Sequence, residues 1–216
     1  LLRQRMIDDM TMRKFGKKTQ SDYIRAVKNF TRFFGHSPDE ATAEDLRQFQ
    51  LEMVSRDTCS STINSAISAL RFFFDVTLDR GDLMTKMSSV YEPRKIPIIL
   101  SPNEVSQFLR ATTSIKYRTA FSIAYGAGLR VSEVVNLKVE DIDSQRMIIR
   151  VEQGKGGKDR NAMLSPVLLN ILRHWWQEGH AKHQLLKAGW LFPGQDPVNP
   201  LSARQLSRVC HDVARL

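Results

Sequence analysis

The chain has 216 residues, 42% of them apolar and 25% charged, which fits one large domain or two small ones. No apolar run reaches the roughly 18 residues that a membrane span needs. The opening LLRQRM has neither a leading Met nor the pattern of a secretory signal, and it suggests a fragment. The formal net charge of +9 favours an anionic partner.

The basic excess is concentrated in the second part of the chain. Residues 1–90 carry 14 basic and 12 acidic groups, whereas residues 91–216 carry 18 and 11. The two cysteines, Cys59 and Cys210, show neither disulfide nor metal-ligand spacing, so we expect a reducing cytosol and no metal site.

The first ninety residues show helical periodicity. Capping boxes that begin at Thr19 and at Thr42 predict the starts of two helices. A third helix is expected from Ser60 or Ser61, and a weaker one near residues 6–12. Together these segments predict a small four-helix bundle.

The stretch SSVYEPRKIP interrupts this pattern. Pro93 and Pro97 favour extended backbone around them, so this stretch is the best candidate for a domain boundary. Arg94 and Lys95 make it a basic linker. The predicted division is a helical domain over 1–89, a linker over 90–97 and a second domain over 98–216.

The second domain starts as helix and then changes period. Ser101, Pro102 and Glu104 form a capping box, and a helix over 118–125 ends at a glycine turn. Further on, alternating apolar residues predict strands, and Ser165 and Ser202 each start another helix. The predicted fold is mainly α with a small three-stranded antiparallel sheet, its strands over residues 139–142, 147–151 and 161–164.

The turn between the last two strands lies in VEQGKGGKDRNAML. The order GKGGKD does not match a P-loop, in which Gly-Lys-Ser/Thr precedes a helix, and YGAGLR does not match a dinucleotide fingerprint. A nucleotide-dependent enzyme is therefore disfavoured. From the loop alone, a simple hairpin with solvated lysines remains open.

Arg130 follows a glycine turn and begins a helix, where the helix dipole favours an anion over a cation. An arginine suits this place if the helix end receives a phosphate. Glu133, one turn further on, could orient the guanidinium. The alternative is an ordinary surface ion pair of small energetic value.

These motifs together resemble the tyrosine recombinase (phage integrase) family, especially Xer-type integrases. The similarity rests on AGLRVSE followed by GKGGKDR, and on TQSDYIRAVKNF and INSAISALRFFF in the first ninety residues. It spans nearly the whole chain. The resemblance implies a SAM-like core-binding domain and an α+β catalytic domain that close around duplex DNA as a C-shaped clamp in the bacterial cytosol or nucleoid.

The family's chemistry is implied by the same resemblance. A tyrosine attacks a DNA phosphate and forms a 3′-phosphotyrosyl link, while two arginines and a histidine stabilise the transition state without a metal or cofactor. Arg130 matches the first arginine, Glu133 its acidic companion, and Lys155 the lysine that protonates the leaving oxygen, with Lys158 as the alternative. Lys158 and Arg160 would otherwise contact phosphate or stabilise the hairpin.

The family's second arginine belongs to a His-x-x-Arg motif, which a nucleophilic tyrosine follows. None of the five histidines here has an arginine three positions later. The four tyrosines, Tyr23, Tyr91, Tyr117 and Tyr125, lie in other regions and are expected in core or surface roles. We therefore expect that this chain alone does not cleave DNA, and a non-catalytic DNA-binding remnant of an integrase is the alternative function.

The resemblance also implies DNA contacts along the helices and the linker. Further candidates on the same helix faces are Arg32, Asn64, Ser68 and Arg215. The full-length protein is expected to act as a homo-tetramer on double-stranded DNA. The predicted DNA contacts are Lys17, Lys18, Arg25, Lys28, Arg71, Arg94, Lys95, Lys158, Arg160, Arg204 and Arg208.

Overall fold

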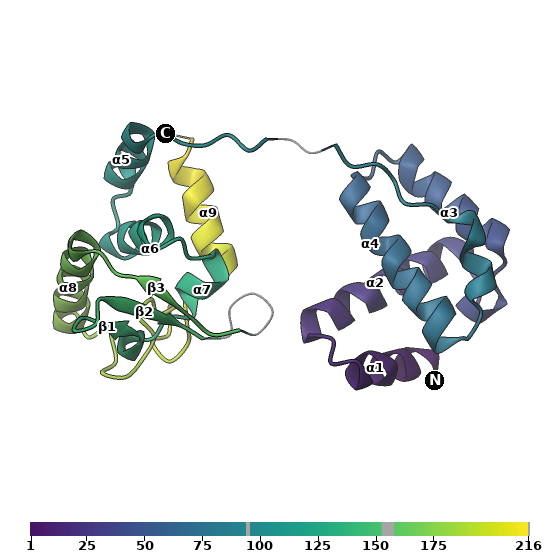
Figure 1. The fold of residues 1–216 in the computed structure, drawn as a ribbon, viewed down its shortest axis with the longest axis horizontal. Helices are drawn as coiled ribbons and strands as arrows, with labels where there is room; N and C mark the ends of the chain where they lie inside the picture. Colours follow the sequence, from purple (N-terminus) through teal and green to yellow (C-terminus); the bar gives the residue numbers. More distant parts are fainter. Residues whose placement is uncertain (94–95, 153–157, 216) are drawn as a thin grey trace. The chain divides into compact units, whose positions relative to one another are not determined.

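The computed structural model describes residues 1–93, 96–152 and 158–215. The chain divides into two compact units, Leu1–Pro97 and Ile98–Leu216 (Figure 1). None of the helices in the described ranges is both long and apolar enough to cross a membrane.

The first unit is a bundle of four α-helices, as predicted. Shorter helical segments follow α2 and α4: Pro38–Glu40 and Gly81–Lys86 are 3-10 turns, and Phe72–Thr77 is a π-helix. The four helices are α1 (Leu2–Met12), α2 (Lys17–Phe34), α3 (Ala43–Ser55) and α4 (Ser60–Arg71).

One of the two predicted capping boxes in this unit is correct. Thr42 accepts a hydrogen bond from the Asp45 backbone N–H, and the Asp45 carboxylate accepts one from the backbone N–H of Thr42. The box predicted at Thr19 is wrong, because α2 already begins at Lys17 after an extended Gly16. The Asp22 carboxylate instead pairs with two cations along the helix, Lys18 and Arg25.

The three phenylalanines of RFFF are all buried, with exposed fractions of 9%, 1% and 0% for Phe72, Phe73 and Phe74. Three successive residues of a surface helix cannot all face one core, because each turns about 100° from the last. Here the π-helical turn contacts α1, α4 and Gly81–Lys86, so the three rings find partners on different sides of it, while Asp75 stays exposed.

Two side-chain amides fix the segment that leaves this bundle. Gln50 on α3 donates to Ser88 O at 2.7 Å and accepts from Ser88 N at 3.2 Å. Asn64 on α4 donates to Val90 O at 2.9 Å and accepts from Val90 N at 2.8 Å. The amide of Asn64 is thus engaged within the protein, which argues against its assignment as a DNA contact.

We predict that Asn64→Ala releases the chain around Val90. Removal of the two hydrogen bonds should cost about 1–2 kcal/mol of unfolding free energy. Hydrogen exchange at the Val90 amide should accelerate strongly. Ser68→Ala, one turn along the same helix face, is the matched control and should leave this amide protected; equal exchange in both variants would contradict the assignment.

The second unit combines five α-helices with a small sheet in its described part. Helix α6 packs against α5, α7 and α8, and α7 packs against α9. The three strands are antiparallel in the order β1-β2-β3. The elements are α5 (Pro102–Ala111), α6 (Ile115–Gly126), α7 (Val131–Val135), β1 (Ile142–Asp143), β2 (Ile148–Val151), β3 (Arg160–Met163), α8 (Pro166–Ala181) and α9 (Ala203–Val213).

The first predicted strand is largely wrong. Residues Val139–Asp141 form a 3-10 turn, and only Ile142–Asp143 are paired as β1. The buried Asp141 carboxylate accepts the Lys138 backbone N–H at 2.7 Å, and this local bond closes the turn before the strand can start. The predicted cap at Ser101 and the start of α8 at Ser165 are confirmed.

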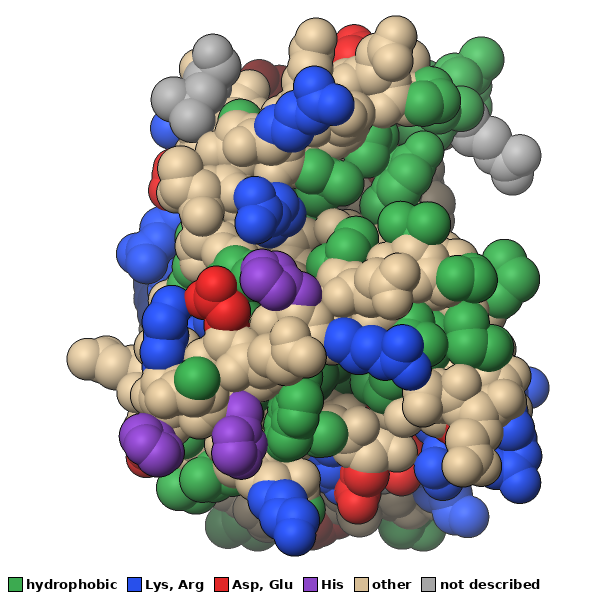
Figure 2. All heavy atoms as spheres, turned by 90° about the vertical axis from the view of Figure 1, so that its left-hand side faces the viewer, with side chains coloured by type: hydrophobic (Ala, Val, Ile, Leu, Met, Phe, Trp, Pro, Cys, Tyr) green, Lys and Arg blue, Asp and Glu red, His purple; other side chains and the backbone are tan. Residues whose placement is uncertain are grey.

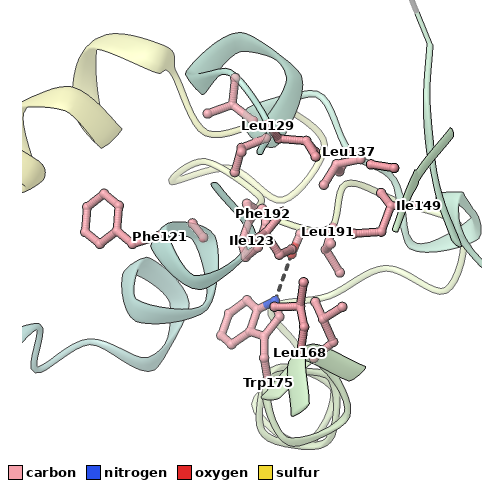
Figure 3. Close-up of a cluster of buried hydrophobic side chains, with 14 of the residues drawn as sticks. Phe121, Ile123, Leu129, Leu137, Ile149, Leu168, Trp175, Leu191 and Phe192 are labelled. Carbon is pink, nitrogen blue, oxygen red and sulfur yellow. Dashed lines mark hydrogen bonds between the residues drawn. The ribbon is translucent and has the colours of Figure 1, made fainter. Parts of the chain in front are cut away.

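Trp175 anchors the core of the second unit (Figure 3). Its side chain is 1% exposed, and its indole N–H donates to Leu191 O at 2.9 Å. Phe192 stacks against its ring, and Ile149 from β2 belongs to the same buried cluster. Leu129, which directly precedes Arg130, also belongs to this cluster, so the core fixes the backbone beside the candidate site.

Candidate functional site

The site starts at the turn between α6 and α7. Gly128 has φ +62°, a left-handed conformation that glycine adopts without strain. Leu129 is buried, and its backbone N–H donates to Ala124 O at 3.2 Å. This turn places Arg130 in extended conformation as the N-cap residue of α7, as the sequence predicted.

Arg130 is held by Glu133 at two points. The Arg130 backbone N–H donates to Glu133 Oε2 at 2.9 Å, and Arg130 Nη1 donates to Oε1 at 2.9 Å. The Glu133 side chain is 4% exposed, whereas that of Arg130 is 54% exposed. The pair therefore differs from an ordinary surface ion pair, because the carboxylate is fixed inside while the guanidinium keeps an open side.

A second arginine shares the same carboxylate. Arg160 Nη2, at the start of β3, donates to Glu133 Oε2 at 2.9 Å and to Gly128 O at 3.4 Å. The β2–β3 hairpin accordingly lies beside α7, as Figure 1 shows. Sequence reasoning missed this contact, because 27 residues separate Arg160 from Glu133.

The electrostatics of Glu133 follow from these contacts. Burial by itself raises the pKa of the Glu133 carboxyl, since it disfavours the charged form. The hydrogen bonds from the Arg130 backbone and from the Arg160 and Arg130 side chains outweigh burial, so the pKa lies below its ordinary value. Glu133 is therefore ionised at neutral pH and holds two cations.

Only one of the two hairpin lysines belongs to the described residues. Lys155 lies outside them, as do Arg94 and Lys95 of the linker. Lys158 is described and exposed. Val151 and Arg160 are paired across β2 and β3, so the stretch that contains both lysines begins and ends beside Arg160.

Helix α9 carries a row of basic side chains. Ser202 caps the helix by accepting the Gln205 backbone N–H at 3.1 Å, and Leu206 is buried on the inner side. The outer side lines a shallow groove of about 810 Å³. Its basic residues are spaced by four, three and four positions and are all exposed: Arg204, Arg208, His211 and Arg215.

Sequence reasoning gave His211 no role, because it was considered only as a member of a His-x-x-Arg pair. The spacing from Arg208 to His211 and on to Arg215 is the signal that could have found it, since these steps repeat one helix face.

In the first unit, three of the predicted DNA contacts meet in one groove. Lys17, Arg25 and Lys28 line a hollow of about 620 Å³ between α1 and α2, together with Arg32. Arg3 from α1 joins them, and the sequence pattern had not pointed to it.

Two further predicted contacts among the described residues of this unit lie apart from the groove. Lys18 is 89% exposed and 3.5 Å from Asp22. Arg71 is exposed at the end of α4.

Basic side chains are not gathered everywhere on the molecule. Figure 2 shows the face on which α5 and α8 lie, where Lys and Arg stand singly among hydrophobic and uncharged side chains. Within the described ranges, no group of three or more His, Cys, Asp or Glu is arranged to hold a metal ion.

The fold matches solved structures of integrases. A lambda integrase dimer bound to a COC′ core site superimposes with a TM-score of 0.76 at 17% identity, over 99% of this chain and 79% of that one. A Tn1549 transposon integrase in complex with a circular intermediate DNA gives 0.75 at 16% identity, over 99% and 77%. At these identities the similarity shows the fold alone, and it confirms the predicted fold class.

Sequence comparison shows the family. The phage integrase family matches residues 99–216, and the SAM-like N-terminal domain of phage integrases matches residues 2–81. A Sinorhizobium fredii protein named as an integrase/recombinase is 45% identical over 220 residues, which cover 100% of this chain and 70% of that protein. Tyrosine recombinase XerA of Pyrococcus horikoshii is 33% identical over 142 residues, 64% of this chain and 48% of XerA. The chain belongs to the phage integrase, or tyrosine recombinase, family.

Because the pKa of Glu133 is lowered on folding, its charge stabilises the second unit above the ordinary glutamate pKa of 4.5, and this contribution is lost as the pH falls through the lowered value. We predict that Glu133→Gln costs about 1–3 kcal/mol at pH 7. The stability of the variant should also fall less than that of the wild type as the pH is lowered from 4.5 through the lowered pKa of Glu133.

Trp175, Trp176 and Trp190 all lie in the second unit, so denaturant unfolding followed by tryptophan fluorescence measures this unit. Glu140→Gln is the control, because that side chain is 64% exposed. If Glu133→Gln and Glu140→Gln gave the same pH profile, the shared carboxylate would not have the stabilising role described.

Proposed function

We propose that this chain belongs to a protein that cleaves and rejoins DNA at specific sites through a covalent 3′-phosphotyrosyl intermediate, with Arg130 on the scissile phosphate. The observation that carries the proposal is the guanidinium of Arg130, which a buried carboxylate orients while half of its surface stays open. A fixed cation of this kind stabilises the negative charge on the non-bridging phosphate oxygens in the transition state without reorganising during the reaction. It can also bind two phosphate oxygens at once.

Lys155 is proposed as the general acid that protonates the departing 5′-oxygen, with Lys158 as the alternative. Both lie on the stretch that connects Val151 to Arg160, and Arg160 contacts the carboxylate that holds Arg130. The phosphate-binding arginine and the proton donor would then act from adjacent parts of the second unit.

The nucleophile is proposed to be none of the tyrosines in this chain. Tyr23 packs against Phe15 and Phe72 in the first unit. Tyr117 accepts a hydrogen bond from Gln205 at 2.8 Å. We propose accordingly that the 216-residue chain binds DNA without cleaving it; a non-catalytic role for the whole protein is the second candidate function.

Double-stranded DNA is the proposed partner. The groove of α1 and α2 and the row on α9 present cations at helical spacing, the pattern expected for contacts to a phosphate backbone. The linker residues Arg94 and Lys95 remain in the proposed contact set. One similar structure is a lambda integrase tetramer bound to a Holliday junction. We propose that the full-length protein likewise acts as a homo-oligomer in the bacterial cytosol or nucleoid.

The function is tested with the full-length protein. DNA duplexes that it binds are first selected, and a nick is then placed in them so that the covalent protein–DNA adduct is trapped and can be measured. Lys155→Ala should slow cleavage of ordinary DNA by about 10²–10⁴-fold, because proton donation is removed. A substrate with a 5′-bridging sulfur needs no proton donor, so Lys155→Ala should cleave it at the wild-type rate. Arg130→Ala should remain slow on both substrates.

Lys158→Ala is the matched control. If the 5′-bridging sulfur substrate restored cleavage in Lys158→Ala and not in Lys155→Ala, Lys158 would be the general acid. The 216-residue chain should form no adduct. Absence of any adduct from the full-length protein on sites that it binds would favour the non-catalytic candidate.

Salt dependence tests the DNA surface of the first unit. Replacing Lys17, Lys28 and Arg32 with Gln should reduce the slope of log affinity against log salt by about 0.9 for each phosphate that the variant no longer neutralises. The slope is measured by fluorescence anisotropy on a labelled duplex.

The control replaces Arg47, Arg56 and Lys86 with Gln, which removes the same charge from the same unit. Each of these cations is already paired with a glutamate. Equal changes of slope in the two triple variants would show that only net charge matters.

A further inference from the structure

We propose that Arg160 is a positioning residue that orients Arg130 through Glu133, and that it does not serve as a DNA phosphate contact. The proposal rests on the proposed function for its catalytic consequence, and on the geometry of the second unit for the positioning itself. It decides between the two roles that the sequence left open for Arg160.

Arg160 contacts the chain on both sides of Arg130. Its Nη2 donates to Gly128 O, two residues before Arg130, and to Glu133 Oε2, three residues after it. The same Oε2 atom accepts the Arg130 backbone N–H at 2.9 Å, and the other oxygen accepts Arg130 Nη1. One guanidinium thus ties together the turn from which Arg130 projects.

The charge balance of the site requires this second cation. A carboxylate that is 4% exposed has given up most of its hydration, so its charge must be balanced by protein donors. If Arg130 were the only partner, its guanidinium would have to neutralise Glu133 and bind a phosphate at the same time. Arg160 neutralises part of the Glu133 charge, so Arg130 keeps positive charge available for an incoming anion.

Arg160 also links the site to the sheet. It is the first residue of β3 and pairs with Val151 of β2 across the ladder. Ala162, two residues on, is buried against Ile149 in the core, so the backbone at Arg160 is fixed. Through one side chain, the base of the hairpin that carries Lys155 and Lys158 is held at a set position relative to Arg130.

The orientation of Arg160 argues against a phosphate role. It donates to a buried carboxylate and a backbone carbonyl, and its side chain is 38% exposed against 54% for Arg130. Arg130 contacts the same carboxylate, but more of its side chain than that of Arg160 stays open to an anion. A phosphate that drew Arg160 away from Glu133 would leave a buried charge with one partner fewer.

The test has one arm without DNA. In the 216-residue chain, Arg160→Gln should accelerate hydrogen exchange at the Arg130 backbone amide at least about tenfold, because its acceptor Glu133 is no longer fixed. Arg160→Lys, which keeps the charge, should restore much of the protection. Arg150→Gln is the matched control: it removes the same charge from the neighbouring strand, where Arg150 donates to Glu140 O. Unchanged exchange in Arg160→Gln would overturn the proposal, whatever the activity.

The second arm measures trapped-adduct formation by the full-length protein. Arg160→Gln should lower the cleavage rate at saturating protein by about 10–100-fold, as loss of a residue that orients a functional group does elsewhere. The DNA affinity and its salt slope should stay unchanged, and Arg160→Lys should recover most of the rate. In a Glu133→Gln background, Arg160→Gln should have little further effect, because both changes act through the same carboxylate.

The outcomes separate the two proposals. In one outcome, Arg160→Gln lowers the salt slope by about one, and its effect on the rate adds to that of Glu133→Gln in the double variant. Arg160 would then be a phosphate contact, and the positioning role would be rejected. A wild-type protein that forms no adduct, combined with faster exchange at Arg130 in Arg160→Gln, would reject the proposed chemistry and retain the positioning. Normal cleavage by Arg160→Gln beside an active wild type would reject the catalytic consequence.

Discussion

The second unit depends on one buried carboxylate shared by two arginines. Glu133 accepts three hydrogen bonds of 2.9 Å from groups that lie on two different elements, α7 with its N-cap and β3. A buried charge costs free energy unless it is paired and hydrogen-bonded, so this carboxylate constrains the positions of its partners. The open side of Arg130 is a consequence of that constraint, and it is where an anion can bind.

The hydrophobic core supplies the rigidity that this arrangement needs. Leu129 precedes Arg130 and belongs to the same buried cluster as Trp175 and Ile149, while Val134 and Val135 bury the far end of α7. A short helix of five residues would not be stable by itself. It is stabilised by packing against α6 and α9, and its N-terminal residue is thereby kept in place.

The two units divide the work in the proposed function. The first offers a groove of cations between α1 and α2 over a core of aromatic rings, which suits sequence-independent attraction to a phosphate backbone. The second adds the row on α9 and the oriented Arg130. Membership of the phage integrase family is consistent with this division, because the SAM-like N-terminal domain and the phage integrase family description match the two parts separately.

The sequence by itself determined what depends on near neighbours in the chain. The capping box at Thr42 and the Arg130–Glu133 pair involve residues three positions apart, and their spacing predicts the contact. Local signals also gave two wrong predictions. A helix start was predicted at Thr19, but α2 begins at Lys17. A strand was predicted over 139–142, but the bond from the Lys138 backbone N–H to Asp141 closes a turn there.

Only the tertiary structure decided the contacts made across long stretches of chain: Arg160 with Glu133, Asn64 with Val90, and Arg3 beside α2. Residues so far apart in sequence share no helical or strand period. They meet because the hydrophobic core within each unit brings the elements of that unit together.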